Sequence, residues 1–320
     1  MQIGYYRHMQ PRHMVKRFQN KISGSRFLLA TVAVITVLVW LASGRLGAGT
    51  AVNLAVTALT SYFLVELDTR NSIIRIYTRM IPASFLLLST MTGAFTNDKF
   101  IFIGLLWTLF LLFFFSSYQD KGASGSVFYA FVCLGIASVL FVQTLFFVPV
   151  MWLAMQSYLM SMGRRTLAAS VVGLLMPYWF ILGFLLFRGD LSFLASHFAG
   201  IAEFGMPFDF AAVTGSCWIS FALLVLLSLV GTVHYVRNSN KDKIRTRMFC
   251  ETIVTTNLTV ILFILLQPVY FTLLLPVLVI TSSVLISHYI VLTNTKLTNR
   301  SVYVIILMVA AATVYNLWIS

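Results

Sequence analysis

Long apolar runs separated by short polar segments fill almost the whole chain. A hydrocarbon core of about 30 Å takes roughly 17–25 helical residues to cross, and eleven runs reach or approach that length. We therefore predict an all-α fold, a polytopic bundle of about eleven transmembrane helices within a range of nine to twelve. The predicted spans are residues 27–43, 48–66, 80–96, 100–117, 127–142, 144–162, 167–187, 211–233, 253–267, 269–292 and 301–318.

Two apolar runs are too long for one crossing. Residues 127–162 alone would form a helix of about 54 Å at 1.5 Å per residue, and residues 253–292 present the same problem. We predict a tight reversal near Gln143-Thr144 in the first run. In the second, Gln267-Pro268 supplies the break, because proline removes a helical hydrogen bond.

Basic residues occur in every second polar segment. Nineteen of the 22 Lys and Arg residues lie in the N-terminal segment and in residues 67–79, 118–126, 163–166, 234–252 and 293–300. Basic residues near membrane spans stay in the cytoplasm. The alternation predicts a cytoplasmic N-terminus and a C-terminus outside. It also supports the two breaks, because treating either long run as one span would place the later basic segments outside the cytoplasm.

Residues 1–26 are basic and contain no acid, and we expect a cytoplasmic or interfacial segment here. We expect residues 27–320 to form a single transmembrane domain. A signal peptide is the alternative, but Ala42-Ser43-Gly44 followed by Arg45 is a poor cleavage site.

Composition agrees with a lipid environment. The chain is 59% hydrophobic and 10% charged, with a mean hydropathy of +0.91, whereas about a quarter of the residues in soluble domains are charged. The net charge of +13 fits cations that face anionic phospholipids better than it fits nucleic acid. The cations expected to contact lipid are Arg164, Arg165, Arg237, Lys241, Lys243, Arg245 and Arg247.

Candidate chemistry is sparse. The three cysteines form no CxxC motif or Cys/His cluster, so we expect no metal and no cofactor. All nine acids lie in loops or at span ends, which disfavours a transporter, because intramembrane charge marks ion pathways. We expect Asn53, Gln156 and Asn257 to hydrogen-bond between helices.

Other polar groups near the cytoplasmic span ends are expected to be structural. Glu66, Asp68 and Arg70 should pair with one another, and His234 and His288 need no ligand to explain them.

The outer loop 188–210 holds the best site candidates. Leu191, Leu194, Phe198 and Ile201 recur at helical spacing, which predicts an amphipathic helix on the outer membrane face. The candidate catalytic residues are Arg188, Asp190, His197 and Glu203. Arginine suits a phosphate group and His or Glu suits proton transfer, so this loop could hold a lipid-linked substrate; a solvated loop helix anchored by Phe is the alternative.

Two segments carry a resemblance to a known family. Arg164 and Arg165 precede Gly173, Leu174, Pro177 and Tyr178, and this pattern within residues 163–187, together with residues 70–92, resembles an uncharacterised multi-pass inner-membrane family of Bacteroidota. The resemblance implies a bacterial cytoplasmic (inner) membrane and no particular activity.

Three functions remain open. The first is a non-catalytic scaffold or accessory component of a cell-envelope process, acting with other envelope membrane proteins. The second is a lipid-linked glycan polymerase, transferase or flippase that uses the outer loop. The third, a small-molecule transporter, is disfavoured by the absence of charge at mid-span.

Overall fold

The computed structural model describes residues 17–42, 48–93, 98–189, 191–205, 207–210, 213 and 215–319, with only the backbone at 48 and 98–100. Helices are the only regular secondary structure in these residues, which confirms the all-α prediction. Six helices are long and apolar enough to cross a membrane, namely α3, α8, α10, α11, α12 with η7, and α13. The other five predicted spans contain shorter apolar helices, so the structure shows an apolar helical bundle typical of a membrane protein.

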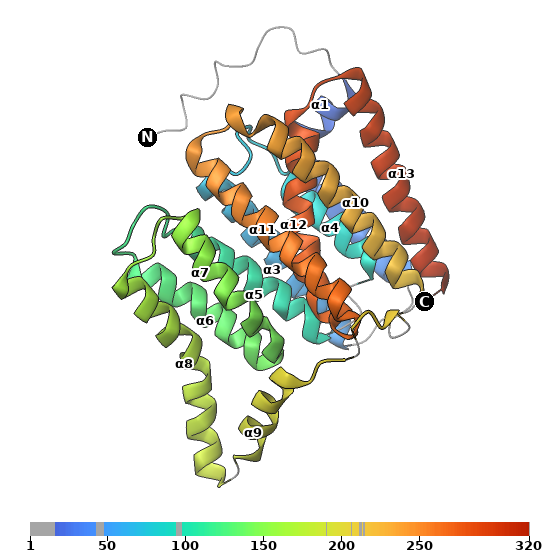
Figure 1. Cartoon of the computed structure of the whole chain (residues 1–320). Coiled ribbons are helices and arrows are strands. Elements are labelled where there is room, and N and C mark those ends of the chain that lie inside the picture. The colour runs from blue at the N-terminus through green and yellow to red at the C-terminus, as the bar shows by residue number, and fades with distance from the viewer. Residues whose placement is uncertain are drawn as a thin grey trace.

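The helices follow the predicted segments in order (Figure 1). Their bounds are α1 Phe18–Ser23, α2 Leu28–Ala42, α3 Ala48–Asn71, α4 Met80–Thr92, α5 Asp98–Phe115, α6 Ser124–Leu140, α7 Phe147–Ser157, α8 Arg164–Arg188, α9 Ser192–Ala199, α10 Gly215–Asn238, α11 Ile244–Leu266, α12 Phe271–Leu292 and α13 Lys296–Ile319.

Both predicted breaks occur where the sequence places them. Phe141 leaves helical geometry at φ −151° and ψ 102°, and the short 3-10 helix η3 (Val142–Phe146) then leads into α7. Gln267 does the same at φ −134° and ψ 76°, before η7 (Pro268–Tyr270) starts the next helix. Each long apolar run therefore forms two antiparallel helices.

Helix α12 lies in the middle of the bundle and packs against α4, α5, α10 and α11. Its apolar stretch is 78% buried, far more than that of any other long helix described. Glycine permits the closest contact: a Cβ on Gly231 of α10 would lie 2.5 Å from the backbone carbonyl of Leu285. Small residues let helices approach in this way where lipid replaces water.

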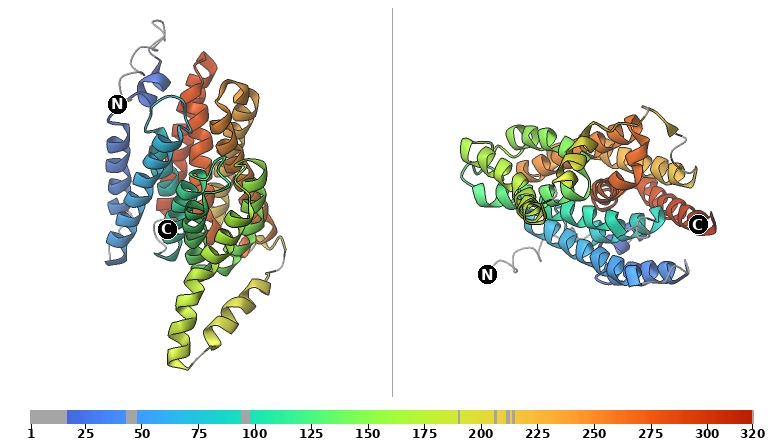
Figure 2. Two further views of the ribbon diagram at one scale, coloured as in Figure 1. Left: turned by 90° about the vertical axis from the view of Figure 1, so that its left-hand side faces the viewer. Right: turned by 90° about the horizontal axis from the view of Figure 1, so that it is seen from below.

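A second glycine contact joins α6 to α8. A Cβ on Gly173 would lie 2.5 Å from the carbonyl oxygen of Phe128, and one on Gly135 would lie 2.7 Å from that of Leu174. Beyond this contact α8 contains Pro177 and leans away from the bundle, and α9 returns toward it (Figures 1 and 2). The C-terminal half of α8 is therefore exposed and apolar, as at Trp179 and Phe187.

The two ends of the bundle differ in charge. One end, which we call the basic end, carries α1, the segment 72–79 and the α10–α11 and α12–α13 turns. Every described Lys and Arg lies there except Lys99 and Arg188. Loop 118–123 belongs to the same end, because the Arg245 guanidinium lies 6.0 Å from the ring of Tyr118. The last turn of α13 lies at the opposite end, which we call the far end.

Replacing Gly231 with Ala should weaken the α10–α12 contact. The new methyl group meets backbone rather than a flexible side chain, and overpacking typically costs about 1–3 kcal/mol. We expect a lower unfolding temperature for the purified protein in mild detergent. Gly183→Ala is the matched control, since nothing lies within 4 Å of its Cβ position; equal unfolding temperatures for the two variants would contradict the packing described.

Candidate functional site

The candidate catalytic residues of the outer loop contact different partners and not one another. The guanidinium of Arg188 lies over the ring of Phe184, 4.7 Å from its centroid and on its own helix. The Nε2 of His197 lies 3.3 Å from the hydroxyl of Tyr178, which in turn lies 2.8 Å from the hydroxyl of Ser138. Asp190 lies outside the described residues.

The C-terminal part of this loop is tied to two turns of the bundle. The Tyr270 hydroxyl donates to the backbone carbonyl of Glu203, and the Gln143 side chain donates to the carbonyl of Gly200 at 2.9 Å. The predicted amphipathic helix is present but short: α9 spans Ser192–Ala199 and is followed by the 3-10 turn η4 (Gly200–Ala202). Among the described residues, Arg188, His197 and Glu203 share no hydrogen bond or ion pair.

The predicted lipid-contact cations fall into two groups. Arg164, Arg165, Arg237 and Lys243 are exposed at the basic end. The other three have partners within the protein. The Lys241 ammonium donates to Asn238 Oδ1 at 2.8 Å, the Arg245 guanidinium donates to Asn71 Oδ1 at 3.2 Å, and Arg247 lies 3.8 Å from the Glu251 carboxylate.

The densest group of buried ionisable side chains lies at the basic end of α12. We call Asp242, His288, His234 and Arg75 the Asp242 cluster. Asp242 Oδ2 lies 3.2 Å from His288 Nε2, and Asp242 Oδ1 lies 3.6 Å from the Arg75 guanidinium. The side chains of Asp242 and His288 are each 2% exposed. A buried carboxylate needs such partners, because its charge is otherwise costly to desolvate.

Neighbouring groups close the cluster. The rings of His234 and His288 have centroids 5.6 Å apart, and Tyr235 lies equally close to His288. The Tyr235 hydroxyl donates to the carbonyl of Arg247, and the Arg75 guanidinium donates to the carbonyl of Lys241. The cluster therefore joins segment 72–79, the α10–α11 turn and α12 at one point.

This arrangement fits a structural hydrogen-bonded cluster. A His–carboxylate pair is suited to proton transfer, and the Nε2–H tautomer of His288 donates to the carboxylate and leaves Nδ1 buried without a protein partner. However, the reacting atoms would be sealed from solvent by the turn that carries Asp242. The geometry therefore fits a structural role for the cluster, which holds the α10–α11 turn against α12, better than it fits catalysis.

Sequence reasoning missed this cluster. The sequence places His288 at a span end where it needs no ligand, and the structure shows it near the end of α12, buried and paired with Asp242. Asp68 was expected to pair with Glu66 and Arg70. The Glu66–Arg70 ion pair is present, but Asp68 is buried and accepts from the Ile74 backbone N–H at 3.0 Å. The available signal was a single acid between Lys241 and Lys243, and it does not identify His288 as the partner of that acid.

Two smaller predictions concern interhelical polar contacts and metals. The Asn257 amide donates to Thr281 and Ser282 of α12, as predicted, whereas Gln156 is exposed. Among the described residues there is no group of three His, Cys, Asp or Glu side chains that could hold a metal ion. No protein-family model, curated protein or solved structure matches the chain.

Removing the Asp242 carboxylate should destabilise the basic end strongly. In Asp242→Ala, buried His288 and the more exposed Arg75 lose their partner, and leaving a buried hydrogen-bonding group without its partner costs about 1–3 kcal/mol. Glu66→Ala is the control, because the Glu66–Arg70 pair is exposed and such pairs contribute about 0–1 kcal/mol.

Thiol labelling provides the measurement. Cys250 is buried in α11 beside the cluster, and Cys133 is buried in α6. In backgrounds that retain only one of these cysteines, Asp242→Ala should increase the labelling rate of Cys250 more than that of Cys133. Unchanged labelling of Cys250 would show that the cluster does not hold the turn in place.

Proposed function

We propose that this chain is a non-catalytic, multi-pass component of a bacterial cytoplasmic membrane that acts as a scaffold or accessory protein in a cell-envelope process. Its basic end faces the cytoplasm and contacts anionic phospholipid headgroups. One observation carries the proposal: acids at the basic end bond within the protein, while several cations project outward unopposed.

Each acid at the basic end has an internal partner. Glu66 pairs with Arg70 and Glu251 with Arg247, while Asp68 and Asp120 accept backbone N–H groups and Asp242 lies in its cluster. Three of these carboxylates therefore face cationic or histidine side chains of the protein itself. The exposed surface retains the positive charge of Arg164, Arg165, Arg237 and Lys243, which favours contact with anionic lipid at about 1 kcal/mol per cation near the surface.

The enzymatic alternative has less support. A lipid-linked glycan transferase would need Arg188, His197 or Glu203 to converge on a substrate, whereas the side chains of Arg188 and His197 contact different partners and Glu203 is attached to Tyr270 through its backbone carbonyl. Arg188→Ala and His197→Ala in the native host separate the two functions. Under the scaffold proposal, deletion of the protein disturbs the envelope glycan profile while both variants keep it normal.

The orientation can be tested with reporters. A C-terminal fusion to an enzyme active only outside the cytoplasm should be active, because the end of α13 lies opposite the basic end and basic segments stay in the cytoplasm. The control is the same reporter inserted in the α10–α11 turn at Asn240, which should be silent. The reverse result in two well-expressed fusions would contradict the proposed orientation.

A scaffold should also have a stoichiometric partner. Affinity purification from the native host in mild detergent should recover a second membrane protein at a constant ratio. Arg237→Gln with Lys243→Gln should reduce association with anionic vesicles by about ten- to thirtyfold, from two cations at about 1 kcal/mol each. Recovery of a lone monomer that retains full activity in a glycan-transfer assay would overturn the proposal.

A further inference from the structure

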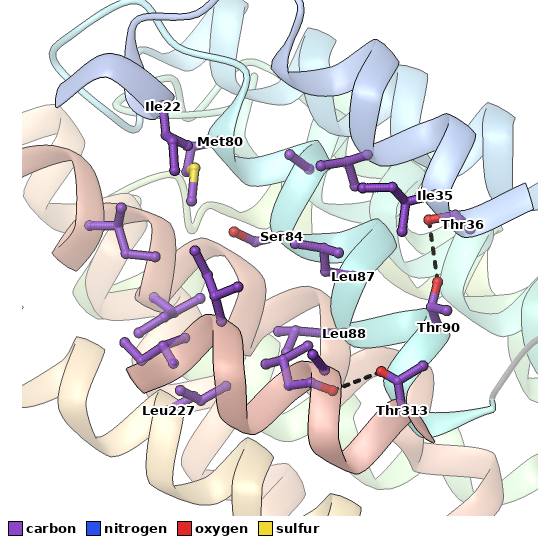
Figure 3. Close-up of a pocket in the computed structure, with 18 of the residues that line it drawn as sticks. Ile22, Ile35, Thr36, Met80, Ser84, Leu87, Leu88, Thr90, Leu227 and Thr313 are labelled. Atoms are coloured by element: carbon purple, nitrogen blue, oxygen red, sulfur yellow. Dashed lines mark hydrogen bonds between the residues drawn. The ribbon is translucent and has the colours of Figure 1, made fainter. Parts of the chain in front are cut away.

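A large apolar groove lies between α2 and α13, on the side of the bundle opposite to α8. Both helices pack on α4, which forms the floor of the groove (Figure 3). Its volume is about 430 Å³, within the range of about 300–1,000 Å³ that small-molecule sites occupy. It also opens sideways, since Ile35 on one wall and Val314 on the other are themselves exposed.

The only polar side chains in the described lining are four hydroxyls, and each has a hydrogen-bond partner within the protein. The hydroxyls at the far end have partners already: Thr90 donates to the carbonyl of Leu86 and lies 3.3 Å from Thr36, and Thr313 donates to the carbonyl of Val309. Ser84 accepts from Ser287 at 3.0 Å. Every other lining side chain is hydrocarbon or thioether. The groove therefore suits an alkyl chain and disfavours a polar solute.

The groove is elongated. The lining residues of α13 run from Val302 to Leu317, about 22 Å at 1.5 Å per residue. A flexible acyl chain can follow such a hydrocarbon-lined groove, and the cations at one end of it favour a phospholipid over an apolar protein segment.

The basic end of the groove is closed by α1. Gln19 is fully buried and donates to the carbonyls of Ile290 and Thr293, which fixes α1 on the α12–α13 turn. Ile22 of α1 then lines the groove beside Met80. Exposed Lys21 and Arg26 flank this closing segment on either side of Ile22, so positive charge borders the end where a lipid phosphate would lie.

We propose that the groove binds one anionic diacyl phospholipid, with one acyl chain between α2 and α13 and its phosphate at Lys21 and Arg26. The second chain stays in the bilayer through the lateral opening. This site is separate from the basic surface of the proposed function, and it does not depend on which side of the membrane the basic end faces.

Native mass spectrometry of the detergent-purified full chain tests the proposal. After washing, phosphatidylglycerol and phosphatidylcholine are added separately as probes, and one phosphatidylglycerol should remain bound. Ala310→Trp and Ile35→Trp fill the groove from opposite walls and should each reduce its retention at least tenfold. Leu307→Trp is the control on the lipid-facing surface of α13 outside the groove, and it should retain the lipid.

A second variant tests the role of the two cations at the end of the groove by combining Lys21→Gln with Arg26→Gln. Loss of two cations should reduce retention of phosphatidylglycerol by about ten- to thirtyfold and leave that of phosphatidylcholine unchanged. Arg70→Gln with Lys121→Gln is the control at exposed cations outside the groove lining, and it should leave the retention of both probes unchanged.

Three results would overturn the proposal. The first is that Leu307→Trp and both groove-filling variants retain phosphatidylglycerol equally. The second is that the wild-type chain binds phosphatidylglycerol and phosphatidylcholine equally. The third is that a protein subunit or a second copy of the chain is bound to the wild type and is lost from the groove-filling variants. Unfolding temperatures close to that of the wild type confirm that each variant is folded, and the two independent Trp positions keep the test valid if one fails.

Discussion

Helix α12 is enclosed by other helices along most of its length, and the arrangement of the bundle follows from the need to pack this helix on all sides. A helix surrounded by protein inside a membrane must satisfy its polar groups locally and must meet neighbours closely enough to gain dispersion energy. The hydroxyls of Thr281 and Ser283 bond to carbonyls of the preceding turn of α12, and Gly231 removes the side chain that would hold α10 away. The described length of α12 carries no Asp, Glu, Lys or Arg, and its ionisable groups are His288 and Tyr289 near its last turn.

Charge is consequently concentrated at the ends, and the Asp242 cluster lies where α12 reaches the basic end. The cluster uses a carboxylate from one turn, an imidazole from α12 and a guanidinium from segment 72–79. Because these three groups pair with one another, the charge that remains on the outer surface of this end is mainly positive. A basic surface on a fixed turn can contact anionic headgroups without ordering a flexible loop, which would cost conformational entropy.

The two sides of the bundle differ in how they meet lipid. On one side, α8 is held to α6 by Gly135 and Gly173 and then leans outward, so its C-terminal half exposes large apolar side chains. On the other side, α2 and α13 leave a groove with an apolar lining. Both surfaces remain stable because hydrocarbon surrounds them, whereas apolar surface of this extent in water would mark an interaction site.

The sequence by itself determined the all-α class, the order of the apolar helices and the two breaks, near Gln143-Thr144 and at Gln267-Pro268. Each of these depends on local run length, proline and charge, so no knowledge of distant contacts was needed. Local spacing also predicted the Glu66–Arg70 pair and the helix after Leu191.

Only the tertiary structure decided which helix faces meet and which polar groups face one another. Asp242 and His288 are 46 positions apart, and nothing in either local pattern says that they pair. The outer-loop residues show the opposite case, since proximity in sequence placed Arg188 and His197 together while their rotamers give them separate partners. The groove likewise depends on two helices from opposite ends of the chain packing on α4, because a cavity arises from the fit of surfaces and leaves no periodic trace in either sequence segment.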